Sequence, residues 1–311
     1  MTRPLLALAL FLLPFAAEAT EGRVLHVDSY HRGNEWNDRI ADAVVATLED
    51  AGVEVRVVHM DTKRNPSEAF KQQAAREVVE VIEAWQPAVV TTSDDNAAKY
   101  LIAEHYRDAA LPFVFCGLNW DAATYGLPFS NTTGMVEVTP IPQIIRLLRG
   151  YAHGDRLGYL TEDTETKRKE LAYHEKLFGI TYDQTYFVSD FAGWQAAYRR
   201  AQNEVDMLVL LGVAAVEDFD DEAAARLAET ETRIPTGTDF AWLMHFSLLG
   251  VGKLPEEQGE WAAKAALAIL DGARPSQIPL TYNKEGKLYF NPKIAARLGI
   301  TEFPPLAELV N

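Results

Sequence analysis

The chain alternates short apolar runs rich in β-branched residues with amphipathic helical stretches, and this feature limits its fold most strongly. The predicted elements of the first half are strands at residues 23–29, 53–60, 88–92 and 113–116 and helices at residues 37–50, about 70–85 and from Asp94 onward. Ile40, Val44 and Leu48 show the spacing that gives a helix one apolar face. This order predicts a parallel sheet covered by helices on both faces, with right-handed crossovers.

The same alternation restarts after Pro140 and Pro142. The predicted elements of this second half are a helix ending near Tyr151, strands at residues 157–160, 185–188, 207–211 and 234–237, and helices at residues 167–178, 192–202 and 221–231. A second α/β unit of this kind predicts two Rossmann-like lobes in tandem, each built on a parallel sheet.

The last part of the chain contains too few predicted helices and strands to form a third domain. It offers a long helix at residues 256–270, a strand pair around residues 278–290 and a helix at residues 293–298. We expect these elements to return and complete both lobes through a hinge crossed several times. The predicted lobe 1 is residues 20–138 with about 243–276, and the predicted lobe 2 is residues 139–242 with about 277–311. In open α/β sheets ligands bind beyond the carboxyl ends of the strands, so the cleft between the lobes is the expected site.

The N-terminus has the pattern of a secretory signal peptide. Arg3 precedes an apolar stretch at residues 5–15, and Ala17-Glu18-Ala19 forms a small-x-small cleavage site. Cleavage would remove residues 1–19, whereas an uncleaved signal would instead anchor the chain. The single cysteine, Cys116, excludes an intrachain disulfide. Export without disulfides favours the bacterial periplasm as the predicted location.

Charge and missing motifs argue against several classes of function. The formal net charge of -16 disfavours nucleic acid and anionic lipid as partners. The sequence has no GxSxG, HExxH, CxxC or Walker motif, and its seven histidines are scattered. Adjacent Asp94 and Asp95 do not form the separated pair that a glycosidase needs. We therefore predict a monomer that is not an enzyme, without metal or cofactor, and with a small molecule as its ligand.

The strand ends of the first half carry most of the candidate ligand contacts. Tyr30, His31 and Trp36 lie in a glycine-containing loop after the first strand, where the aromatic rings could clasp a ligand or pack the loop instead. Asp61 follows the second strand and could accept from a ligand. An internal salt bridge with Lys63 or Arg64 is the alternative.

The third and fourth strands end in polar residues as well. The third is followed by Ser93, Asp94, Asp95 and Asn96 at a helix start, where helix capping explains one of them more easily than all. The fourth is followed by Gly117, which permits close backbone approach, and by Asn119, which can donate and accept. Cys116 is predicted to be a buried small hydrophobe.

The second half offers weaker signals, for which capping or turn formation is the favoured alternative. Thr161 and Asp163 follow one strand, Gly212 follows another, and Asp239 with Phe240 follows a third. The predicted ligand contacts are Tyr30, His31, Trp36, Asp61, Ser93, Asp95, Asn96, Gly117, Asn119, Asp163, Gly212 and Asp239.

Several segments make the chain resemble a known family over nearly its whole length. They are SYHRGNEW, MDTKR, SDDNA and VFCGLN in the first half, and EEQGEW, ILDGARPSQIP and NPKIAARLGI near the end. With these segments it is similar to the ABC-transporter substrate-binding family, which has the type I periplasmic binding protein fold and includes tryptophan- and tyrosine-binding members. The resemblance implies closure of two lobes over a small ligand and delivery to an ABC permease, without chemistry. The first-half segments look like a subgroup that also occurs as sensory modules fused to kinases or cyclic-dinucleotide enzymes. A ligand-sensing partner of such a membrane protein is therefore the alternative.

Overall fold

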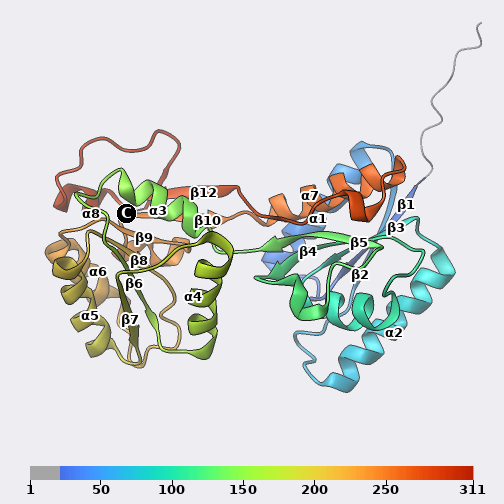
Figure 1. Cartoon of the computed structure of the whole chain (residues 1–311), viewed down its shortest axis with the longest axis horizontal. Coiled ribbons are helices and arrows are strands. Elements are labelled where there is room, and N and C mark those ends of the chain that lie inside the picture. Colours follow the sequence, from blue (N-terminus) through green and yellow to red (C-terminus); the bar gives the residue numbers. More distant parts are fainter. Residues whose placement is uncertain (1–21, 311) are drawn as a thin grey trace, which may run out of the picture.

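Two α/β lobes, connected by extended segments, make up the computed structural model of the chain, which describes residues 22–310 (Figure 1). The predicted signal peptide lies outside the described residues. Among residues 22–310, no helix has both the length and the apolar character needed to cross a membrane.

Lobe 1 is built on a parallel sheet with the strand order β11-β5-β4-β3-β1-β2. Its strands are β1 (Arg23–Asp28), β2 (Glu54–His59), β3 (Val89–Ser93), β4 (Phe113–Asn119), β5 (Thr132–Glu137) and β11 (Thr281–Tyr282). Helices α1 (Glu35–Asp50) and α7 (Pro255–Leu270) cover one face, and α2 (Glu68–Trp85) and a π-helix (Ala97–Ala103) cover the other (Figure 1). Successive residues of β1 alternate between these faces: Val24 packs under α1 and α7, and Leu25 packs under α2.

Helices α1 and α7 approach each other closely because α7 presents very small residues to α1. A Cβ atom at Gly259 would lie 2.2 Å from the backbone oxygen of Ile40, so any larger residue would force the helices apart. Ala262, Ala263 and Ala266 are fully buried on the same helix. This close packing brings Gln258, at the start of α7, next to the end of β4.

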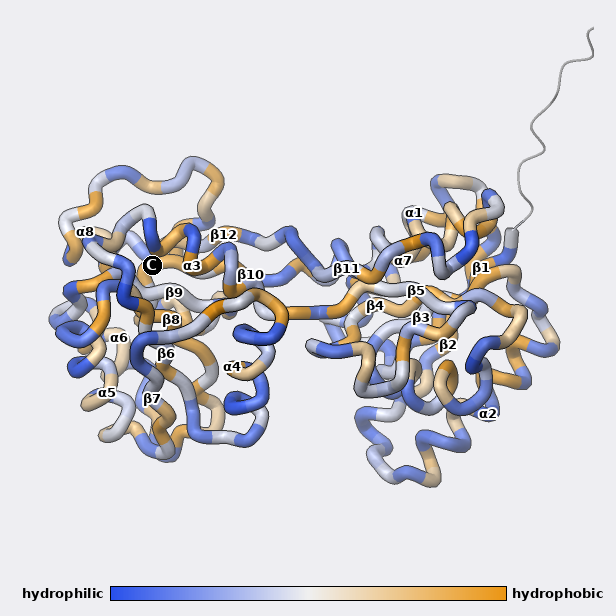
Figure 2. Tube along the Cα trace, in the orientation of Figure 1, coloured by the Kyte–Doolittle hydropathy of each residue, from blue (hydrophilic) through white to orange (hydrophobic). Residues whose placement is uncertain are grey.

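Lobe 2 is built on a sheet with the order β13-β12-β10-β9-β8-β6-β7. Its strands are β6 (Leu157–Glu162), β7 (Gln184–Val188), β8 (Met207–Leu210), β9 (Thr236–Thr238), β10 (Leu249–Lys253), β12 (Gly286–Phe290) and β13 (Glu308–Leu309). Its helices are α3 (Ile141–Arg149), α4 (Glu165–Phe178), α5 (Phe191–Glu204), α6 (Asp221–Glu231) and α8 (Pro292–Arg297). In Figure 2 the strands of both lobes contain apolar stretches, whereas hydrophilic residues colour the outer turns of helices such as α2.

Within residues 22–310 the chain crosses between the lobes three times. It leaves lobe 1 after β5, returns between β10 and α7, and leaves again between β11 and β12 (Figure 1). The predicted two-lobed α/β fold with a multiply crossed hinge is confirmed. Strands β5, β10 and β11 end where the chain leaves a lobe, and β12 begins where the chain enters lobe 2 again, so these strand ends lie at the crossings.

The strand pairings correct several predicted details. The prediction assigns residues 243–253 to lobe 1, but β10 pairs with β9 in lobe 2. Residues 281–282, predicted in lobe 2, form β11 and pair with β5 in lobe 1. The predicted strand pair of residues 278–290 is wrong, because β11 and β12 belong to different sheets. The lobe 2 sheet is also not wholly parallel, since β12 runs antiparallel to β10.

The error at β10 has a physical cause. The sequence of β10, Leu-Gly-Val-Gly-Lys, has two glycines and one β-branched residue, so it carries little strand signal of its own. Its pairing is set by partners distant in sequence. The other predicted lobe limits stay a prediction.

Candidate ligand-binding cleft

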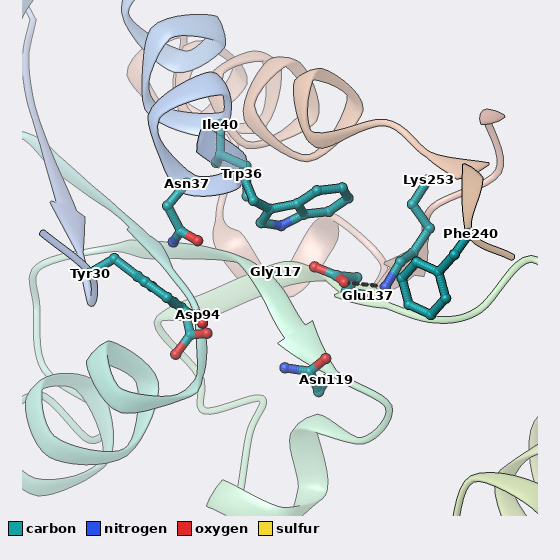
Figure 3. Close-up of a pocket in the computed structure, with 10 residues that line it drawn as sticks. All are labelled: Tyr30, Trp36, Asn37, Ile40, Asp94, Gly117, Asn119, Glu137, Phe240 and Lys253. Atoms are coloured by element: carbon teal, nitrogen blue, oxygen red, sulfur yellow. Dashed lines mark hydrogen bonds and ion pairs between the residues drawn. The ribbon is translucent and has the colours of Figure 1, made fainter. Parts of the chain in front are cut away.

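A cavity of about 210 Å³ lies at the carboxyl ends of the lobe 1 strands, where they face lobe 2 (Figure 3). Its walls combine aromatic, amide and charged side chains. They come from Tyr30, Trp36, Asn37, Ile40, Asp94, Gly117, Asn119 and Glu137 in lobe 1 and from Phe240 and Lys253 in lobe 2. Because both lobes contribute, the shape of the cavity depends on the angle between them.

The first charged group lies within lobe 1, and we call Tyr30, Lys63 and Asp94 the lobe 1 trio, of which Tyr30 and Asp94 line the cavity. The ammonium of Lys63 lies 3.0 Å from Asp94 Oδ1 and 4.8 Å from the centre of the Tyr30 ring. Burial raises the pKa of Asp94 to about 6, although Lys63 opposes this shift. Burial lowers the pKa of Lys63, but Asp94, with smaller contributions from Tyr30 and Asp95, raises it, and the net pKa lies above its ordinary value.

The second charged group joins the lobes, and we call Trp36, Glu137 and Lys253 the interlobe trio. Lys253 Nζ donates to Glu137 Oε1 over 2.5 Å and lies 5.5 Å from the Trp36 ring centre (Figure 3). The side chains of Glu137 and Lys253 are only 10% and 16% exposed. Burial lowers the pKa of Lys253, whereas the carboxylates of Glu137 and of more distant Asp239 raise it. The net pKa lies above its ordinary value, so the ammonium stays protonated. Glu137 ends β5 and Lys253 ends β10, so this pair spans the cleft beside the crossing segments.

A buried carboxylate under the cavity fixes the side chains above it. Asp28 Oδ1 accepts from Asn37 Nδ2 over 2.8 Å and from the Tyr30 backbone N–H over 3.0 Å, and Ser93 Oγ donates to it over 3.1 Å. Its other oxygen lies 3.2 Å from His59 Nδ1. Asp28 therefore positions Asn37 and the Tyr30 loop.

Gly117 allows two strand ends to approach at the floor of the cavity. Its φ of +64° lies in the left-handed region, and a Cβ atom there would lie 3.4 Å from the backbone nitrogen of Asp94. The Gly117 N–H donates to Gln258 Oε1 over 2.9 Å. The predicted role of this glycine in close backbone approach agrees with this geometry.

Four of the predicted contacts come together in the cavity: Tyr30, Trp36, Gly117 and Asn119. Trp36 lies in the first turn of α1 and not in the predicted loop, and it packs against the core under α1 and α7 while it lines the cavity. Asp95 does not line the cavity but holds a residue that does, because Asn119 Nδ2 donates to its Oδ2 over 2.7 Å.

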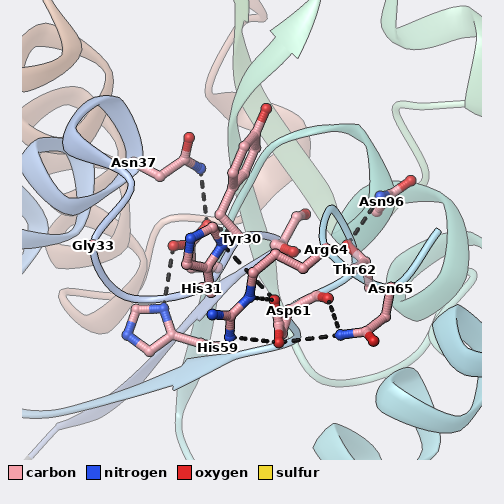
Figure 4. Close-up of polar contacts among 12 residues, drawn as sticks. Tyr30, His31, Gly33, Asn37, His59, Asp61, Thr62, Arg64, Asn65 and Asn96 are labelled. Carbon is pink, nitrogen blue, oxygen red and sulfur yellow. Dashed lines mark hydrogen bonds and ion pairs between the residues drawn. The ribbon is translucent and has the colours of Figure 1, made fainter.

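Other predicted residues of lobe 1 lie outside this cavity. Asp61 is held by two hydrogen bonds of 2.7 Å from Arg64, which is the internal salt bridge weighed as its alternative, and His31 lies 3.7 Å from it (Figure 4). Ser93 is fully buried beneath the cavity, and Asn96 donates to Thr62 Oγ1 over 2.9 Å. A direct contact of these residues with a ligand stays a prediction.

The predicted residues of lobe 2 do not line the cavity either. Asp163 pairs with Arg168 over 2.7 Å, and Gly212 lies so close to Lys167 that a Cβ atom there would approach its side chain to 2.6 Å. Asp239 is buried, and its Oδ1 has no hydrogen-bond partner among the described residues. Burial and the nearby carboxylate of Glu170 raise the pKa of Asp239 to about 7.

The sequence analysis missed several residues that line the cavity. Glu137 and Lys253 end strands that were not among those predicted, and Asn37 was counted only as part of a helix. Phe240 and Asp94 were noted beside predicted contacts but not selected. Asp94 and Phe240 both follow a strand end closely, and this position could have indicated that they lie at the cavity.

No protein-family model matches the chain, and no curated protein matches its sequence. Solved structures match it along most of its length. A ligand-free, open substrate-binding protein with adhesive properties from Clostridium difficile is 14% identical with a TM-score of 0.69, and 93% of this chain and 99% of that one are covered. The chain has the type I periplasmic binding protein fold.

Two further structures share this binding-protein fold. An ABC domain in complex with L-Trp from Streptococcus pneumonia is 19% identical with a TM-score of 0.52, covering 94% of this chain and all (100%) of that chain. An arabinose-binding protein from Geobacillus stearothermophilus is 12% identical with a TM-score of 0.52, covering 89% and 99%. At these identities the similarity shows the fold, and the ligands named belong to those proteins.

Proposed function

We propose that this chain is a periplasmic solute-binding protein that captures a small molecule in the cavity between its lobes and delivers it to an ABC importer. The observation that carries the proposal is the cavity itself, because both lobes line it and the chain crosses between them beside it. A ligand that contacts both walls binds a closed arrangement better than an open one and so shifts the population towards closure. Structures with the same fold that bind L-Trp and arabinose support a small-molecule ligand.

A thermal-shift screen of residues 20–311 tests the capture of a ligand. Amino acids, short peptides, sugars, nucleosides and carboxylates would be compared, since a ligand that binds the folded state alone raises the melting temperature by mass action. We expect one class to raise it sharply. A flat response across all classes, with protein shown to be free of copurified ligand, would contradict the proposal.

A pair of tryptophan variants locates the binding site. Trp36→Ala removes a ring from the cavity, whereas Trp85→Ala removes a half-buried ring that lies 5.6 Å from the Arg23 guanidinium on the far side of lobe 1. For a compound found in the screen, we expect Trp36→Ala to weaken binding at least about tenfold, the size of one lost aromatic contact. Trp85→Ala should leave the affinity unchanged. Equal affinities of the two variants would place the ligand elsewhere.

The delivery step has a separate test in the genes beside this one. Adjacent permease and ATPase genes are expected for an importer. A neighbouring sensor kinase or cyclase gene without a permease gene would contradict delivery while leaving ligand capture intact.

A further inference from the structure

Lys253 carries the single positive charge among the described residues that line the cavity. Its ammonium donates to Glu137 Oε1 and to no other acceptor among the described residues. Since an ammonium has three N–H donors, two remain for other acceptors. The carboxylates of Glu137 and of more distant Asp239 keep it protonated despite burial. The cavity therefore offers a charged donor that is only partly used.

The position of Glu137 would allow a ligand to replace it as the acceptor of the Lys253 ammonium. Glu137 belongs to lobe 1 and Lys253 to lobe 2, and both side chains line the cavity rather than lying behind it (Figure 3). Lys63 differs in both respects, because it does not line the cavity and its partner Asp94 is in its own lobe. A ligand anion in the cavity could thus reach Lys253 and take the place of Glu137.

We propose that Lys253 recognises an anionic group of the ligand, and that Glu137 is an internal carboxylate that occupies Lys253 until the ligand arrives. The inference rests on the proposed function of the cavity and adds the chemical class of its ligand, a compound carrying a carboxylate. The neighbouring Trp36 ring, 5.5 Å from the ammonium, provides an apolar surface for the rest of the molecule. Glu137 then competes with the ligand anion for the Lys253 ammonium. A residue that only held the lobes together would not compete in this way.

Three probes with one phenyl ring and different end groups test this assignment: phenylacetate, phenylacetamide and 2-phenylethylamine. Their dissociation constants would be measured by calorimetry for the mature protein and for Glu137→Gln and Lys253→Met. We expect the mature protein to prefer phenylacetate to phenylacetamide. Glu137→Gln, which removes the competitor but keeps its shape, should tighten phenylacetate binding about tenfold, and Lys253→Met should abolish the preference.

Opposite results would overturn the assignment. If Glu137→Gln weakens phenylacetate and phenylacetamide equally, Glu137 only holds the lobes together. If the amine binds best and loses affinity in Glu137→Gln, then Glu137 is the recognition group. Absence of phenylacetate binding to both the mature protein and Glu137→Gln would also refute it. Should Lys253→Met fail to fold, the direction of the Glu137→Gln effect decides alone.

The outcome also separates this inference from the proposed function. If only neutral or cationic compounds raise the melting temperature in the broad screen, the cavity remains a ligand site and the role of Lys253 is wrong. If no compound of any class binds, both proposals fail together.

Discussion

The two lysine–carboxylate pairs at the cavity have similar partners but different supports. In the lobe 1 trio, Lys63 follows β2 and Asp94 follows β3, two strands of one sheet with β1 between them. Gly117, near the end of β4, lies close to the Asp94 backbone. In the interlobe trio, Glu137 and Lys253 end strands of two different sheets, and the hinge brings them together. A change in the angle between the lobes would therefore leave the geometry of the lobe 1 trio unchanged and alter that of the interlobe trio. A contact that spans a hinge can respond to a ligand in a way that a contact within one lobe cannot.

The largest difference between the pairs should appear when each lysine loses its charge. Lys253→Met leaves the carboxylate of Glu137 unpaired at 10% exposure, and breaking a buried pair in this way costs about 3 kcal/mol. Lys63→Met leaves Asp94 equally buried, at 10% exposure, but it should cost only about 1 kcal/mol because Lys63 itself is 34% exposed and solvent screens the pair. Urea unfolding of both variants measures these free energies. Equal losses of unfolding free energy in the two variants would show that the interlobe pair contributes no more to stability than the pair within lobe 1.

Asp239 tests the electrostatic support of the interlobe trio, since its carboxylate raises the pKa of Lys253. Burial raises the pKa of Asp239 itself to about 7. A carboxyl group whose pKa is raised on folding stabilises the fold at low pH, and this contribution is lost as the pH rises through the folded value. Asp239→Asn should therefore be more stable than the parent protein at pH 8, by about 2 kcal/mol, and should lose this gain below about pH 4.

Asp163→Asn is the matched control for this prediction, because Asp163 is an exposed residue of the same lobe that pairs with Arg168. Thermal melts from pH 4 to pH 8 would compare the two variants. A gain at pH 8 in Asp163→Asn as large as that in Asp239→Asn would mean that net charge, rather than burial, causes the effect.

The smallest expected effect concerns the backbone support of the lobe 1 trio. Gly117→Ala and Gly52→Ala both place a Cβ atom on a residue with positive φ, at +64° and +78°, and each should cost about 1 kcal/mol. Only at Gly117 does the new atom meet neighbours, including the Asp94 backbone, whereas nothing lies within 4 Å at Gly52. We expect a ligand found in the screen to bind Gly117→Ala more weakly and Gly52→Ala normally. A normal affinity of Gly117→Ala for the ligand would show that the geometry of the lobe 1 trio does not contribute to binding.

The candidate site could be predicted only where its residues follow a strongly patterned strand. Tyr30, Gly117 and Asn119 come directly after runs of buried apolar residues, and parallel strands bring their carboxyl ends to one edge of the sheet. Asp61 was selected by the same reasoning, but Arg64, three residues further on, already holds its carboxylate. Position after a strand therefore selects residues near the cleft and does not distinguish those that are already paired.

The sequence by itself determined the two α/β lobes, because apolar periodicity is a local property that each segment carries alone. It also determined that polar groups would gather at the strand ends of lobe 1. Only the tertiary structure decided that Glu137 and Lys253, separated by 116 positions, meet as the charged contact between the lobes. The glycines of β10 conceal that strand, and its place is fixed by pairing with β9 and β12 rather than by its own residues. Contacts of this kind depend on the packing of the whole chain, which no local pattern encodes.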